Sequence, residues 1–355
     1  MDNSDFDEHT YHILSPSFFQ RWSQCNNEKS PDILDEIRQA HIIQLLYVEM
    51  VNALQTILDA LKAKGLCNEI LGKSGLSGGC INDSLKISTD AGPLFVKTNA
   101  SSNATTMFEG EAVALNTINE AVPDFSPKAL CSGSLPTGGG FLVLSFIQFT
   151  GSNSKHQIAF AKKLAQLHST TSPNGKFGFP VTTMCGSTEQ ENTWEDEWVT
   201  FYKERRLRPM LKKCQRNNPS DSELVRLGNI VVDRVVPMLM KDIIIKPVLI
   251  HGDLWSGNWS VNADTGEPVI YDPASCYGHS EFELSIMTMF GSPSKDFFKE
   301  YHNHHPPQEP YFKERQELYK LYHYLNHYFI FGSGYRGSCV SIMRRLCALA
   351  ENEGN

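Results

Sequence analysis

Residues 248–273 read VLIHGDLWSGNWSVNADTGEPVIYDP, and two apolar runs within them each lead to a carboxylate. The run VLI at the start predicts the end of a buried strand, and Asp253 follows it after one histidine and one glycine. Asn258 lies five positions beyond Asp253. A second apolar pair, VI, then leads to Tyr-Asp272-Pro. The segment therefore predicts two strand-to-carboxylate units with an amide side chain between them.

This arrangement matches the catalytic and metal loops of kinases. In that pattern Asp253 would accept the proton of a substrate hydroxyl, and Asn258 and Asp272 would bind Mg²⁺. Ordinary turns also favour Asp, Asn and Gly, but a turn has no need for this spacing after two strands. Gly252 stands where protein kinases have arginine, and Asp272 lies in Tyr-Asp-Pro instead of Asp-Phe-Gly. The pattern therefore favours small-molecule kinases of the same fold.

Length and composition limit the possible partners and location. A chain of 355 residues is long enough for two lobes with separate cores. The net charge of −8 argues against nucleic acid or an anionic membrane as the main partner, and no apolar run approaches the roughly 20 residues that span a bilayer. The N-terminus is acidic, and the nine cysteines form no CxxC pair, which indicates neither a zinc site nor a disulfide framework. We expect a cytoplasmic protein with reduced thiols.

The apolar pattern divides the chain into three parts. Residues 1–60 form an N-terminal extension whose first thirty residues we expect to be mobile and whose remainder has a helical period, as one bent helix or two packed helices. Residues 61–147 predict a smaller lobe with an antiparallel sheet and one helix. Residues 148–355 predict a larger, mainly helical lobe that carries the catalytic and metal loops. The fold class is α+β, with the bilobal arrangement of protein kinases.

The smaller lobe contains candidate nucleotide-binding residues. Gly78 and Gly79 would let backbone amides approach phosphates closely, although their spacing is not the GxGxxG of kinases. The β-rich run FVK ends at Lys97, the place where kinases have the lysine that binds the α- and β-phosphates. A solvated lysine at a strand end is the alternative. The helix at 104–120 would supply the carboxylate that pairs with this lysine; we choose Glu111, because Glu109 is more typical of a solvated surface charge.

The apolar strand ending at Leu144 leads into Ser145 and Phe146, which we expect to form the hinge that pairs with adenine. In the larger lobe, His323 and His327 lie at i, i+4 spacing, which a metal ion could use. The aromatic residues around them indicate a packing helix instead.

With these residues in view, the sequence closely resembles the fructosamine-3-kinase (ketosamine-3-kinase) family, which is related in fold to the aminoglycoside phosphotransferases. The resemblance covers roughly residues 52–350. It rests on GGCIN at 78–82, DAGPLFVK at 90–97, MFEGE at 107–111, KFGF at 176–179, HGDLWSGN at 251–258, YDPASCYGHSEFEL at 271–284 and MRRL at 343–346. Residues before about 50 have no counterpart in the family pattern, and Ser145-Phe146 differs from the more polar hinge often found there.

The resemblance implies an ATP- and Mg²⁺-dependent kinase for the 3-hydroxyl of ketosamines. The substrates would be fructosamine and ribulosamine adducts on small amines or on protein lysines, and phosphorylation would lead to deglycation and repair. It further implies Asp253 as base, Asn258 and Asp272 as metal ligands, and Lys97 with Glu111 as the pair that positions ATP. It also implies that Cys80 in the phosphate loop is linked to redox-sensitive dimerisation, so the protein would be a monomer or a redox-dependent homodimer. A kinase for another amine or alcohol, such as an aminoglycoside or choline, and a non-catalytic, nucleotide-binding redox sensor are the alternatives.

Overall fold

The computed structural model describes residues 33–76 and 82–353, with side chains from residue 48 onward in those ranges. The predicted phosphate-loop residues Gly78, Gly79 and Cys80 lie outside them, as does the segment 1–32. The contacts divide the chain into two compact units, one with the residues up to Ala112 and Ala129–Ile147, the other with Val113–Lys128 and Gln148 onward. Among the described residues, no helix is both long enough and apolar enough to cross a bilayer.

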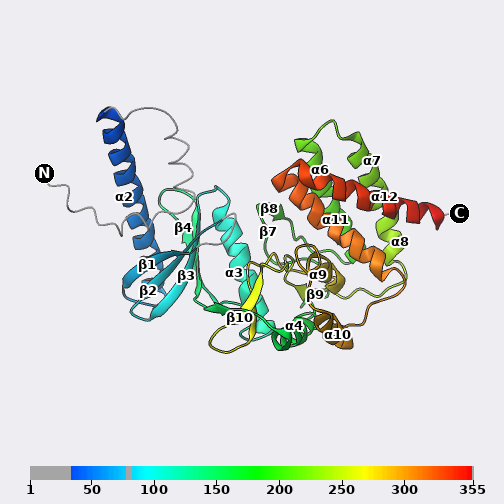
Figure 1. Ribbon diagram of the computed structural model, residues 1–355, viewed down its shortest axis with the longest axis horizontal. Helices are drawn as coiled ribbons and strands as arrows, with labels where there is room; N and C mark the ends of the chain where they lie inside the picture. Colours follow the sequence, from blue (N-terminus) through cyan, green and yellow to red (C-terminus); the bar gives the residue numbers. More distant parts are fainter. Residues whose placement is uncertain (1–32, 77–81, 354–355) are drawn as a thin grey trace. The chain divides into compact units, whose positions relative to one another are not determined.

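The first unit is built on a five-stranded antiparallel sheet, with the strands in the order β1-β2-β3-β5-β4 (Figure 1). The strands are β1 (Ile70–Leu76), β2 (Asp83–Thr89), β3 (Gly92–Asn99), β4 (Ala129–Ser134) and β5 (Gly140–Ser145). The β2–β3 turn contains only Asp90 and Ala91, and it closes because Gly92 adopts a φ of 115°. Gly139 in the β4–β5 turn has a φ of 79°, and a Cβ there would lie 2.1 Å from the Asn99 carbonyl oxygen. Both turns therefore depend on a glycine.

A single helix, α2 (Ile33–Ala63), precedes this sheet, so the two predicted helical stretches are one element. Its C-terminal part buries Ile57 and Leu61 in a small core with Ile87, Val96 and Val143 of the sheet. The next helix, α3 (Ala104–Ala121), begins in the first unit and ends in the second. The apolar side chains in the last turns of α2 thus pack α2 against the sheet.

Residues 113–128 pack with the second unit, although the sequence-based division assigned them to the smaller lobe. The second half of α3 and the loop after it bury Ile118 and Phe125 in the larger core, where the rings of Phe125 and Phe160 have centroids 6.2 Å apart. The backbone carbonyl of Phe125 also accepts the N–H of Ile270, at 2.8 Å. A helix whose two halves bury different apolar faces cannot be assigned to one lobe from its periodicity.

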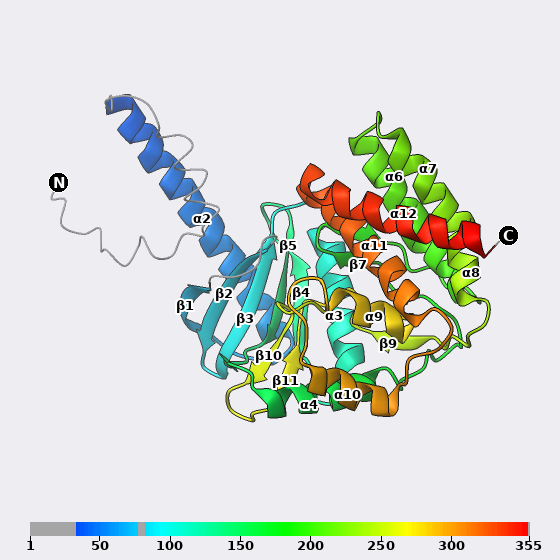
Figure 2. The same ribbon diagram turned by 45° about the vertical axis from the view of Figure 1, so that its right-hand side comes forward.

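The second unit is mainly helical and holds the larger hydrophobic core (Figures 1 and 2). Its first helices are α4 (Ser154–Leu167), α5 (Trp198–Phe201), α6 (Arg208–Asn217), α7 (Ser222–Ile230) and α8 (Val236–Met240). The later ones are α9 (Ser280–Ile286), α10 (Lys295–His304), α11 (Phe312–Phe331) and α12 (Arg336–Asn352). Short strands form three small sheets, β6-β10-β11, β9-β12 and β7-β8. Their bounds are β6 (Phe149–Thr150), β7 (Thr183–Cys185), β8 (Thr188–Gln190), β9 (Val248–Ile250), β10 (Trp259–Asn262), β11 (Pro268–Ile270) and β12 (Cys276–Gly278).

Two helical segments of this unit each contain a wide π-helical turn next to a proline. One turn, η2 (Tyr202–Leu207), joins α5 to α6 shortly before Pro209, and η3 (Val231–Val235) joins α7 to α8 shortly before Pro237. Proline lacks an N–H and its ring crowds the carbonyl one turn earlier. A wider turn relieves that crowding, so both helices continue past proline without a break.

A buried ion pair connects helices α9 and α11. The guanidinium of Arg315 lies 2.7 Å (Nε) and 3.1 Å (Nη2) from the two carboxylate oxygens of Glu281, and both residues are buried. Its remaining N–H groups donate to the backbone carbonyls of Leu239, Gln308 and Pro310. Since all the partners are present, the pair can tolerate its burial.

Removing one partner would leave a buried charge without compensation. We expect Arg315→Met to lower the free energy of unfolding by about 3–5 kcal/mol, measured by urea denaturation. The control is Arg345→Met, which removes a surface ion pair with Glu317 and should cost less than about 1 kcal/mol. Equal losses in the two variants would contradict this account.

Candidate active site

The stretch 248–273 folds as two strand-to-loop units within the second unit. β9 is fully buried and pairs with β12, and the loop that carries Asp253 follows it. β11 is also fully buried, pairs with β10, and is followed by Asp272. The two buried strands predicted from the apolar runs are confirmed. Each ends where a carboxylate begins a loop.

Hydrogen bonds join the two loops to each other. The backbone N–H of Tyr271 donates to the carbonyl of Asn258 at 3.0 Å, and the N–H of Ala274 donates to the carbonyl of His251 at 2.9 Å. The side-chain amide of Asn258 donates to the backbone carbonyl of Asp253 at 2.8 Å. The five-residue spacing between Asp253 and Asn258 is therefore the closure of one tight loop.

His251 braces this loop from inside. Its ring is fully buried, Nδ1 accepts the backbone N–H of Asp253 at 3.2 Å, and Nε2 contacts the carbonyl of Tyr271 at 2.9 Å. These partners assign the proton to Nε2, because Nδ1 acts as acceptor. The histidine thus holds both loops through backbone groups.

Gly252 is required by the backbone itself. Its φ is 87°, and a Cβ at this position would lie 2.2 Å from the carbonyl oxygen of Ala274. A larger residue cannot fit without moving one of the loops. The glycine that stands in place of the kinase arginine therefore has a conformational origin.

A buried carboxylate from helix α9 anchors the same backbone. The side chain of Glu283 is fully buried and accepts the backbone N–H groups of both His251 and Gly252, the latter at 3.1 and 3.2 Å. Two charge-assisted bonds to consecutive N–H groups fix the direction in which the chain leaves β9. Glu283 therefore acts as a positioning residue for Asp253.

Asp253 is strongly perturbed electrostatically. Burial of its carboxyl group, followed by the negative charges of Asp272 and Glu283, raises its pKa well above the ordinary value, against the opposing hydrogen bonds from Cys185 and Asn258. The residue as a whole is half-buried. A carboxyl group whose pKa is raised by burial and by neighbouring negative charges is typical of a catalytic acid or base.

The second carboxylate loop carries oxygen atoms that could bind a cation. Asp272 adopts a φ of 60°, which is uncommon for a residue with a side chain. Its charge acts on Asp253, and the side-chain nitrogen of Asn258 is used in the loop, so the amide oxygen is the Asn258 atom that can meet a cation. Carboxylate and amide oxygens are the donors that Mg²⁺ prefers. The negative charges of Asp253 and Asp272 repel each other, and a cation bound near them would offset that repulsion.

In the first unit, the predicted lysine and glutamate lie together. Lys97 Nζ, on β3, lies 2.6 Å from Glu111 Oε1, on α3, and both residues are buried. Glu109 is exposed. A buried, paired Lys97 excludes the alternative of a solvated lysine at a strand end.

The predicted hinge residues follow the sheet. Leu144 pairs with Phe95 in the ladder between β3 and β5 and is buried, and Ser145 is the last residue of β5. Phe146 comes next, with the ammonium group of Lys86 4.2 Å from the centroid of its ring. The chain therefore leaves the sheet at the position expected for a hinge.

Comparison with known proteins identifies the family. The model of the family described as fructosamine kinase matches residues 50–349. The chain belongs to the fructosamine kinase family. It is 42% identical over 282 residues to the protein-ribulosamine 3-kinase, chloroplastic, of Arabidopsis thaliana, covering 79% of this chain and 84% of that protein. It is 38% identical over 303 residues to the ketosamine-3-kinase of Mus musculus, covering 79% of this chain and 96% of that protein. The chain is therefore a phosphotransferase.

Solved structures support the same fold for this fructosamine kinase family member. The crystal structure of a protein described as a fructosamine-3-kinase from Haemophilus somnus 129PT has a TM-score of 0.75 at 24% identity, covering 84% of this chain and 99% of that chain. An aminoglycoside phosphotransferase has a TM-score of 0.52 at 12% identity, covering 82% and 97%. The predicted kinase-like α+β fold is confirmed.

The sequence motifs gave no role to two residues of this site, Glu283 and Cys185. Glu283 was visible only as the second acid of EFEL, a charged residue in an otherwise apolar run. Cys185 lies with its sulfur within 4.8 Å of the Asp253 carboxyl group, yet it is 68 positions away in the sequence and belongs to no recognisable motif. Buried acids inside apolar helices are a usable signal, whereas a lone distant cysteine is not.

The Glu283 anchor can be tested by an isosteric change. Glu283→Gln replaces one acceptor oxygen with an NH₂ group that cannot receive an N–H, so the loop should shift. We expect kcat to fall about 10²-fold with little change in KM for the nucleotide, since small displacements of catalytic groups have costs of that order. Glu197→Gln, at an exposed residue with no side-chain cap bond, is the control. Wild-type kcat in Glu283→Gln would contradict the positioning role.

The raised pKa of Asp253 also predicts a stability effect. The unfolded chain releases this proton near pH 4, below the folded-state pKa, so the ionised carboxylate destabilises the folded state at neutral pH. Without nucleotide or metal, Asp253→Asn should unfold at a higher temperature than the wild type at pH 7. The difference should narrow as the pH falls through the folded-state pKa and vanish near pH 4. The unfolding temperatures are measured by calorimetry, with Asp264→Asn, at an exposed turn residue, as the control. Equal unfolding temperatures of the two variants at each pH would contradict this prediction.

Proposed function

We propose that this kinase transfers the γ-phosphoryl group of ATP to the 3-hydroxyl of a ketosamine. The observation that carries the proposal is the HGDLWSGN loop, closed by its own hydrogen bonds, in a chain that belongs to the fructosamine kinase family. The names of the plant and mouse relatives, a ribulosamine 3-kinase and a ketosamine-3-kinase, support this substrate class. The acceptors would be fructosamine or ribulosamine adducts, on small amines or on protein lysines.

In this mechanism Asp253 accepts the proton of the 3-hydroxyl as the oxygen attacks the γ-phosphorus. Such transfer depends mainly on positioning and on charge neutralisation. His251 and Glu283 supply the positioning, because they fix the backbone on both sides of Asp253. A raised pKa makes the Asp253 carboxylate a stronger base than an ordinary aspartate.

The oxygens of Asn258 and Asp272 would hold Mg²⁺, which neutralises charge on the phosphates when bound. Lys97, held by Glu111, would contact the α- and β-phosphates. Gly78 and Gly79 stay predicted phosphate-loop residues, and the backbone at Leu144, Ser145 and Phe146 stays the predicted adenine site.

The product explains the biological use of the reaction. Phosphorylation at the 3-hydroxyl places a phosphate on the carbon next to the ketosamine carbonyl. When the ketosamine enolises towards C1, this phosphate is allylic to the new double bond and is a good leaving group. Its elimination leaves an imine at C1, and hydrolysis of that imine by water frees the amine. The proposed role is therefore deglycation, a repair of amines that sugars have modified.

Oligomeric state, redox control and location stay predictions. A redox-dependent homodimer through Cys80 would appear as a reductant-sensitive change in mass by light scattering, absent in Cys80→Ser. The predicted location is cytoplasmic, whereas the plant relatives are named chloroplastic. Fractionation of cells that express the full chain tests it.

The function is tested by steady-state kinetics on ribulosyl-lysine, fructosyl-lysine, choline and an aminoglycoside. We expect ATP-dependent turnover with a ketosamine and a fall of about 10²–10⁴-fold in kcat for Asp253→Asn, the usual cost of losing a general base. Asp264→Asn should retain wild-type turnover. Turnover confined to choline or the aminoglycoside would identify a different small-molecule kinase. No transfer to any acceptor would favour a non-catalytic nucleotide-binding protein.

A further inference from the structure

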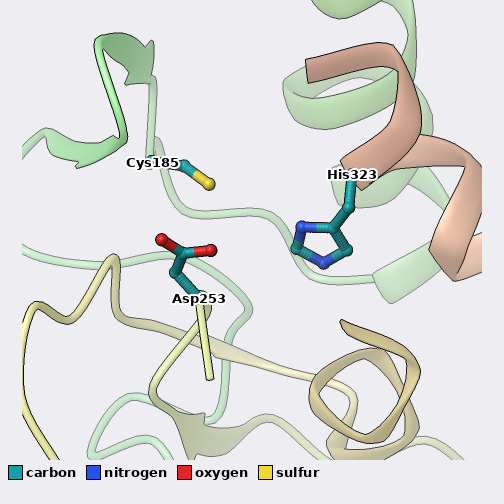
Figure 3. Close-up of side chains that lie close together, drawn as sticks. All are labelled: Cys185, Asp253 and His323. Carbon is teal, nitrogen blue, oxygen red and sulfur yellow. The ribbon is translucent and has the colours of Figure 1, made fainter. Parts of the chain in front are cut away.

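Three side chains from separate elements of the second unit lie close together, and one of them is the proposed base (Figure 3). Cys185 ends β7, Asp253 follows β9 and His323 lies in α11. The thiol sulfur, a carboxylate oxygen and an imidazole nitrogen all lie within 4.8 Å of one another. One soft, one hard and one intermediate donor atom thus surround a single point.

His323 has an unsatisfied hydrogen-bonding capacity at this point. The residue is fully buried, and neither ring nitrogen has a hydrogen-bond partner in the part of the chain that the structure describes. Burial lowers its pKa to about 3, so the ring is neutral and offers a lone pair. Its ring packs against Phe282, with centroids 5.0 Å apart, as expected for an aromatic packing helix. A buried imidazole without partners is costly unless something binds it.

Cys185 is buried and held in position. Its sulfur lies within 4.8 Å of an oxygen of the Asp253 carboxyl group. The side-chain nitrogen of Asn326 donates to the Cys185 carbonyl at 3.2 Å and lies 3.4 Å from the sulfur. The hydroxyl of Thr188 in turn donates to Asn326 Oδ1 at 2.5 Å. Outer partners of this kind orient the ligands of metal sites.

We propose that Cys185, Asp253 and His323 form a binding site for Zn²⁺ or a divalent cation of similar softness. Thiolate, imidazole and carboxylate are the zinc ligands of proteins, and three protein ligands leave a fourth position for water. Zinc bond lengths place tetrahedral ligand atoms about 3.5 Å apart. The three ligand atoms, which lie within 4.8 Å of one another, therefore need to approach by about 1 Å at most. Binding replaces the thiol proton, which passes to solvent, and forms the metal–sulfur bond.

The proposed site differs from the magnesium ligands by its chemistry. Mg²⁺ prefers an all-oxygen shell, whereas sulfur and imidazole nitrogen favour zinc. The two cations would therefore occupy different donor sets, with Asp253 close to both. If the proposed function holds, zinc on the Asp253 carboxylate removes the lone pair that accepts the substrate proton. Zinc would then inhibit phosphate transfer by blocking the base.

The experiment is a titration of the full chain with Co²⁺ as spectroscopic probe, in excess Mg²⁺, without nucleotide and with a phosphine reductant. A thiolate-to-cobalt charge-transfer band at one equivalent, displaced by Zn²⁺, is expected. Cys185→Ser should abolish the band, and His323→Gln should weaken affinity by more than about 10-fold. The controls are Cys214→Ser, a buried cysteine whose thiol contacts the Leu325 carbonyl, and His327→Gln, one turn along α11. Both should retain the band.

Retention of the band in Cys185→Ser, unchanged affinity in His323→Gln, or no band in the wild type would overturn the proposal. The kinetic arm separates this site from the proposed function. If cobalt binds as described and ketosamine phosphorylation continues in saturating Zn²⁺, the metal site stands and the assignment of Asp253 as base is wrong.

Discussion

The catalytic loop depends on one buried carboxylate. Glu283 accepts two consecutive backbone N–H groups, those of His251 and Gly252, at a place where water cannot reach them. An unpaired charge there would be strongly unfavourable, and so would two unpaired N–H groups. Each is therefore stable only in the presence of the other. A conformation of the loop that separated these partners would therefore be disfavoured.

The same short helix connects the loop to the rest of the larger core. Glu281 and Glu283 lie two residues apart on α9, so their side chains point in different directions. Glu283 reaches the catalytic backbone, whereas Glu281 forms the buried pair with Arg315 of α11. His323 lies on α11 two turns beyond Arg315 and faces the Asp253 side of the site. The position of α9 thus sets both the base and the wall opposite it.

The sequence predicted what is local and left out what is assembled. The two buried strands and the five-residue spacing from Asp253 to Asn258 follow from patterns within 26 residues. Glu111 was chosen because Glu109 is more typical of a solvated surface charge, and the structure pairs Glu111 with Lys97 and leaves Glu109 exposed. Glu283, Cys185 and His323 could not be assigned, since their roles arise only when distant elements pack together. The division of α3 between two cores was missed for the same reason, as a helical period does not say which core each half contacts.

The electrostatics of Asp253 suit its proposed role as base. A carboxylate that must take a proton from a sugar hydroxyl benefits from a raised pKa, and burial beside Asp272 and Glu283 provides it. The same charges repel one another, so the folded protein gains from any cation that enters. Mg²⁺ fits the oxygen donors, but it has little affinity for the thiol of Cys185 and the imidazole of His323. A site that raises the basicity of one carboxylate among other acids therefore also attracts cations. The side chains next to that carboxylate, Cys185 and His323, determine which cation it binds.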